Sequence, residues 1–136
     1  MRIATEAWFR GRWRMARLVA GPGGEVTAAF AGTCRFAPDG EGLVCEESGI
    51  LRHRSGRYRA GRVTLWRFAG AGRVEVRFAD GRPFHAFSAE RPETEHRCGA
   101  DRYRVAYAFD ADRWLSRWLV CGPAKDFVMT TRYRRA

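Results

Sequence analysis

Apolar and polar residues alternate along most of this chain, in short segments separated by Gly, Pro and Asp. Alternation with a period of two is typical of β-strands that lay one face on a core. The pattern predicts nine strands, over residues 13–20, 26–36, 43–51, 57–68, 73–79, 82–87, 103–109, 114–122 and 127–133.

Two stretches depart from this alternation. Thr5 is a suitable N-cap and Gly11 a suitable stop, so we expect a short helix over residues 5–10, with Ala7 and Trp8 against the core. Residues 88–100 carry no strand pattern and form the longest irregular connection that we expect.

The predicted strands are joined mostly by tight turns, so neighbours along the chain should pair antiparallel. An open sheet of this width would expose its edges, and closure into a barrel removes them. We therefore expect an all-β fold: a single antiparallel up-and-down β-barrel of about 8–10 strands with a short N-terminal helix. The chain has 136 residues, which fits one domain over residues 1–136.

The Asp80–Gly81 dipeptide, between two alternating segments, predicts a tight hairpin. A two-residue turn there pairs Ala79 with Arg82 and, further along, Val76 with His85. Cross-strand partners share a face. His85 is therefore expected inside the barrel, either as a hydrogen-bonded core imidazole or as a group that faces a ligand.

Several other polar or amphipathic side chains alternate in phase with apolar neighbours. Buried charges are unfavourable unless they are paired, so these residues form either a satisfied polar network or the lining of a polar cavity. Together with His85 they are our candidate ligand-binding residues: Glu47, Arg62, Trp66, Tyr103 and Tyr107.

The segment Gly11-Arg12-Trp13 resembles the GxW signature of lipocalin-like (calycin) barrels. A wider set of segments resembles an uncharacterised, mainly bacterial domain family predicted to be lipocalin-like: FAGTCRF, GLVCEESGIL, FADGRPFH, HRCGADRYRVAY, GPAKDF and RYRR. The resemblance implies that Trp13 closes the base of the barrel and that a C-terminal arginine, Arg132 or Arg134, packs across it. It implies no activity.

The formal net charge is +10, and Lys125 is the only lysine. Because the arginines alternate along strands and form no continuous run, we favour a solvated basic face and do not expect nucleic acid as the main partner. Lys125 follows a Gly122–Pro123 turn. It either forms a surface ion pair or contacts an anion at the barrel mouth.

The four cysteines form no CxxC pair, so we expect free thiols, mostly buried, and no metal site. The N-terminus has no apolar signal core, and no apolar run is long enough for a membrane helix. We therefore expect a cytoplasmic protein that does not enter a membrane. A homodimer is left open.

Four functions fit these features. The first is a small-molecule-binding barrel, holding an anionic or aromatic ligand near His85, Arg62 and Tyr103. The second is a barrel enzyme, isomerase- or decarboxylase-like, with His85 as general acid or base oriented by Glu47. The third is a haem-binding barrel with His85 or His96 as axial ligand. We expect no other cofactor. The fourth is a nucleic-acid binder that uses its arginines.

Overall fold

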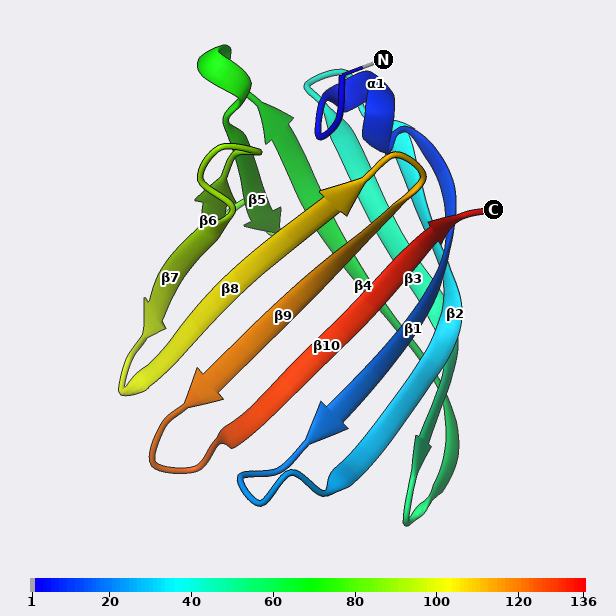
Figure 1. Ribbon diagram of the computed structural model, residues 1–136, viewed down its shortest axis with the longest axis vertical. Helices are drawn as coiled ribbons and strands as arrows, with labels where there is room; N and C mark the ends of the chain where they lie inside the picture. The colour runs from blue at the N-terminus through cyan, green and yellow to red at the C-terminus, as the bar shows by residue number, and fades with distance from the viewer. Residues whose placement is uncertain (1) are drawn as a thin grey trace.

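The computed structural model describes residues 2–136, which form one short α-helix, a 3-10 turn and a sheet of ten strands (Figure 1). The all-β fold and the short N-terminal helix are therefore confirmed. In chain order the elements are α1 (Glu6–Phe9), β1 (Gly11–Ala20), β2 (Val26–Pro38), β3 (Leu43–His53), β4 (Gly56–Phe68), η1 (Gly70–Gly72), β5 (Val74–Phe78), β6 (Pro83–Phe87), β7 (Glu93–Cys98), β8 (Asp101–Asp110), β9 (Arg113–Cys121) and β10 (Asp126–Arg135).

The sheet is an antiparallel meander with the order β6-β5-β4-β3-β2-β1-β10-β9-β8-β7. The first and last strands of the chain pair with each other over eight residues, from Trp13↔Arg135 to Ala20↔Val128. The two ends of the sheet, β6 and β7, come close enough to touch. The wall is therefore a nearly closed barrel, and Figure 1 shows α1 lying at one end of it.

Strand β7 lies inside the connection that we expected to be irregular, so that prediction was wrong. Its inward positions, Thr94 and His96, are only half-buried, and charged residues take the outward ones. An edge strand of this kind lacks the apolar alternation that marks a core strand. Its pairing with β8 is regular from Glu93↔Ala106 to Cys98↔Asp101.

The β5–β6 hairpin differs from the expected two-residue turn. The Phe78 amide donates to the Arg82 carbonyl at 2.9 Å, and Gly81 has a φ of 90°, so three residues form the loop. The register then shifts beyond Arg77↔Pro83, which leaves Phe84 as an extra, inward residue. The longer loop and the bulge shift the register by one residue in opposite directions, so the predicted Val76↔His85 pair is confirmed.

A plug of aromatic residues closes the α1 end of the barrel. Trp13 is fully buried, and its indole nitrogen donates to the Phe9 carbonyl at 2.9 Å. Thr5 caps α1 as predicted, by accepting from the Trp8 amide. The helix buries Trp8 and Phe9, whereas Ala7 is exposed, so the predicted inward face was one residue out.

The arginine that packs across Trp13 is Arg135, with its guanidinium carbon 3.7 Å from the ring centroid. It also donates to the backbone carbonyls of Trp8 and Arg10. The expectation of Arg132 or Arg134 was wrong, because both are exposed on the outer face of β10. Side chains alternate along a strand, and on β10 it is the odd-numbered residues that point inward.

Candidate functional site

A buried carboxylate organises the middle of the barrel. Glu47 on β3 lies within 3.1 Å of an Arg17 guanidinium nitrogen and 3.2 Å of one from Arg62. Tyr133 donates a further, longer hydrogen bond of 3.4 Å to the same carboxylate, and Thr131 accepts one from Arg17 at 2.8 Å. One carboxylate and two guanidinium groups therefore meet inside the sheet.

This arrangement keeps Glu47 ionised. Burial alone would raise the pKa of its carboxyl, but the positive charges of Arg62 and Arg17 outweigh burial and hold the pKa below the ordinary value of 4.5. The network carries one negative and two positive charges, so an excess of positive charge remains at Arg62.

His85 lies beside this network without joining it. Its Nε2 is 2.7 Å from the hydroxyl oxygen of Tyr107, and among residues 2–136 nothing bonds to its Nδ1. Burial, followed by the nearby Arg62 charge, lowers the pKa of His85 to about 3. Burial also raises the pKa of Tyr107. Both groups are therefore neutral near pH 7.

The proposed catalytic pair of His85 and Glu47 is not formed, because each has other hydrogen-bond partners. A general acid or base works best when its pKa is near the working pH, and His85 is far below it. The enzyme hypothesis stays a prediction, and in this structure His85 bonds Tyr107 and has no contact with the carboxylate that was expected to orient it.

The interior around these groups is almost filled. A cavity of only about 20 Å³ remains. That is room for about one water molecule. Five of the predicted ligand-binding residues meet around this small space: Glu47, Arg62, Trp66, His85 and Tyr107.

A larger cavity, which we call the mouth cavity, has a volume of about 170 Å³ and lies toward the Tyr103 end of β8. The opposite end of that strand, at Phe109, packs on Trp8 of the plug. The mouth cavity is lined by Arg62, Val63, Thr64, Phe78, Phe84, His96, Cys98, Tyr103 and Trp118. Its wall is largely aromatic, and Phe84 is central, with its ring 5.0 Å from Trp118 and 5.3 Å from His96.

Arg62 lines both cavities, as do Thr64, Phe84 and Trp118. Its guanidinium stacks 4.7 Å from the Trp118 ring while one nitrogen bonds Glu47. Its Nε is buried and has no hydrogen-bond partner within residues 2–136. The mouth cavity thus combines flat apolar walls with a cation that retains unused donors, which suits an acidic group on an aromatic body.

Lys125 lies at the rim of the mouth cavity. Its Nζ donates to the Tyr103 hydroxyl at 3.0 Å and lies 3.6 Å from a carboxylate oxygen of Asp101. The surface ion pair is therefore present, and the contact of Lys125 with an anion at the barrel mouth stays a prediction.

Two residues of the mouth cavity, Trp118 and Phe84, were missed in the sequence, and His96 was named only as a possible haem ligand. Trp118 alternates with Trp114 and Ser116 and could have been placed inward by that pattern. His96 lay in the supposed irregular connection. Phe84 was assigned to the outward face because the bulge was not foreseen.

The haem hypothesis stays a prediction. Of its two histidines, only His96 lines the mouth cavity, while His85 borders about 20 Å³ of space, too little for a macrocycle. Within residues 2–136, no three potential metal ligands of the His, Cys, Asp or Glu type lie together.

All four cysteines are free of disulfide bonds. Only Cys34 and Cys45 are buried, so the expectation of mostly buried thiols held for two of the four.

Residues 9–135 match a family of unknown function, DUF6314. The chain belongs to this family. No curated protein matches the chain. Within the described residues 2–136, no helix has the length and apolar character needed to cross a bilayer.

A similar fold occurs in the S-type phycobiliprotein lyase CPES from Guillardia theta. The alignment covers 99% of this chain and 94% of the lyase, with a TM-score of 0.65 and 10% sequence identity. At that identity the likeness concerns the fold, and it supports the predicted calycin-like barrel.

Proposed function

We propose that this protein is a small-molecule-binding barrel whose ligand is a small aromatic anion held in the mouth cavity. The observation that carries this proposal is Arg62, a cation that lines an aromatic-walled cavity and whose side chain is still 34% exposed although one of its nitrogens bonds Glu47. The ligand's acidic group would bond to Arg62, and its flat body would lie against Trp118 and Phe84.

Two further observations support this proposal. Arg62 is already oriented by Glu47 and Trp118, so little conformational freedom is lost when a ligand binds. A similar fold belongs to a protein named as a phycobiliprotein lyase, so a barrel of this shape carries an activity in at least one other protein. The cytoplasmic location stays a prediction.

The test is isothermal titration calorimetry with 2-naphthoate and its uncharged analogue 2-naphthalenemethanol. A charged hydrogen bond contributes about 1.5–3 kcal/mol, so we expect the anion to bind roughly tenfold to a hundredfold more tightly than the alcohol. Arg62→Gln should remove that preference.

The matched control is Arg59→Gln, which makes the same charge change on the outer face of β4. It should leave the preference intact. Equal binding of the two probes by the unchanged protein would contradict the proposal, as would an equal loss in both variants. A Soret band in the purified protein would instead favour haem.

A further inference from the structure

The outer surface of the barrel carries a row of arginines on three neighbouring strands. Arg14 on β1 is the register partner of Arg134 on β10, and Arg134 is the register partner of Arg113 on β9. Neighbouring strands lie about 4.8 Å apart, and like charges that face each other across strands destabilise a sheet. Arg132 lies on the same face, in the adjacent row.

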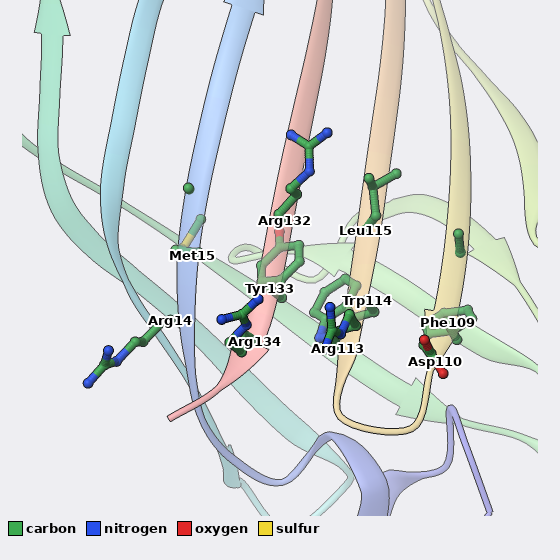
Figure 2. Close-up of a pocket in the computed structure, with 12 residues that line it drawn as sticks. Arg14, Met15, Phe109, Asp110, Arg113, Trp114, Leu115, Arg132, Tyr133 and Arg134 are labelled. Carbon is green, nitrogen blue, oxygen red and sulfur yellow. The ribbon is translucent and has the colours of Figure 1, made fainter.

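These four arginines line a groove of about 570 Å³, which we call the arginine groove. Figure 2 shows Arg14, Arg134 and Arg113 following one another across the three strands. The outward residues between them are short or apolar, so the guanidinium groups are the most prominent feature of the lining; they are Ala16, Ala108 and Leu115. Asp110 lies at one edge.

The charge of the groove is hardly neutralised by the protein itself. Within residues 2–136, Arg14, Arg132 and Arg134 form no ion pair, and Arg113 pairs with Asp112 at 3.1 Å. Three exposed arginines outside the groove are paired. Arg73, Arg82 and Arg97 each lie within 4.0 Å of a carboxylate. Unpaired arginines also occur elsewhere on the outer wall, for example Arg52 and Arg59, but the four arginines of the groove lie in two adjacent rows across β1, β10 and β9.

We propose that the arginine groove binds the phosphate backbone of a single-stranded nucleic acid. The planar fork of arginine matches phosphate oxygens in a bidentate way, and a row of such forks suits a chain with regularly repeated charge. No aromatic side chain points outward from β1, β9 or β10 in the described structure, so bases have no platform for stacking. Binding therefore depends on the backbone and is independent of base sequence.

An acidic protein partner fits this surface less well. Protein interfaces have cores that are poor in charged residues and rich in aromatic ones. The arginine groove exposes mainly charge, because Met15, Trp114 and Tyr133 also line it but are buried, and Leu115 is the large apolar residue at an outward position. A flexible single strand can also follow the curved outer wall of a barrel, which a straight duplex cannot.

The experiment is fluorescence anisotropy with labelled oligo(dT), oligo(dA) and oligo(U) of about 20 nucleotides, across about 50–300 mM KCl. We expect affinity to fall with salt and to be similar for the three strands. The triple variant R14Q/R132Q/R134Q should bind about a hundredfold more weakly at about 0.1 M salt, with the log–log slope reduced by about 2.

The control variant R73Q/R82Q/R97Q removes the same charge from paired arginines outside the groove, and it should bind within about threefold of the unchanged protein. Near-UV circular dichroism checks that both variants are folded. An equal loss in the two variants would overturn the proposal in favour of a diffuse charge effect. Competition by poly-L-glutamate at equal charge, or no binding at about 50 mM salt, would also overturn it. This test does not involve the mouth cavity.

Discussion

Strands β1 and β10 each carry arginines on both faces, and the two faces treat them differently. Inside, Arg17 bonds Glu47 and Thr131, and Arg135 stacks on Trp13. On the outer face, Arg14 and Arg134 are register partners, so each faces another positive charge across the two strands. A buried guanidinium needs a specific partner, whereas an exposed one is solvated by water. The inward arginines thus stabilise the fold through specific contacts, whereas the outward ones make no such contact.

Among the inward residues, Glu47 should have the largest effect on the free energy of unfolding. Glu47→Gln leaves Arg17 and Arg62 without their carboxylate, and breaking a buried pair costs about 3–5 kcal/mol of stability. Urea unfolding at neutral pH measures this loss. Because the folded-state pKa of Glu47 is lowered, the difference from the unchanged protein should shrink as pH falls below 4.5.

The outward neighbour Glu46 provides the control for this measurement. It forms no ion pair within residues 2–136, and Glu46→Gln should change stability by less than about 0.5 kcal/mol. A similar loss of stability in the Glu46 and Glu47 variants would contradict the view that charged residues on the inner face of β3 matter more for stability than those on its outer face.

A pH-dependent effect of intermediate size should come from His85. The unfolded chain takes up a proton near pH 6.5, but folded His85 does so only near its pKa of about 3. Stability should therefore fall as pH falls through this window, with a loss of about 3 kcal/mol by about pH 4. His85→Gln should flatten this part of the curve of unfolding free energy against pH.

His53→Gln is the matched variant, since His53 is exposed at the β3–β4 turn and bonds Ser55. It should keep the slope of the unchanged protein. A His85→Gln variant with an unaltered slope would show that this imidazole is not excluded from protonation in the folded barrel.

The smallest effects compare two adjacent residues of β10. Arg135→Gln removes a desolvated cation–π contact and two backbone hydrogen bonds, and it should lower stability by about 2 kcal/mol. Arg134→Gln relieves repulsion from Arg14 and Arg113, and it should raise stability slightly, by up to about 0.5 kcal/mol. Thermal unfolding of both variants distinguishes them. A loss in the Arg134 variant would reveal an inward role that the geometry does not show.

The sequence predicted the architecture well because alternation reports which face of a strand is buried. Alternation placed Glu47, His85 and Tyr107 inward, and the structure buries all three. The alternation gave the wrong answer where the face that a residue points to depends on local backbone geometry. The bulge at Phe84 and the polar inward positions of β7 follow from backbone hydrogen bonding, which leaves little trace in residue type.

The candidate site was harder to predict from the sequence than the fold was. The sequence suggested one polar interior, whereas the structure separates a filled core around His85 from a mouth cavity around Tyr103. Cavity volume depends on how neighbouring side chains interlock, and Trp118 and Phe84 decide where space remains. No pattern along a single strand contains that information, because the side chains that line the mouth cavity come from all six strands from β4 to β9.

The pairing of β1 with β10 has a consequence for how the chain folds as it is synthesised. The strand that completes the wall is the last of ten, and its partner is the first. Until β10 leaves the ribosome, β1 has one unpaired edge, and the ends of this ladder are more than a hundred residues apart along the chain (Trp13↔Arg135). Contacts so distant in sequence form slowly. One edge of β1 therefore stays without its hydrogen-bonding partner for nearly the whole synthesis of the chain.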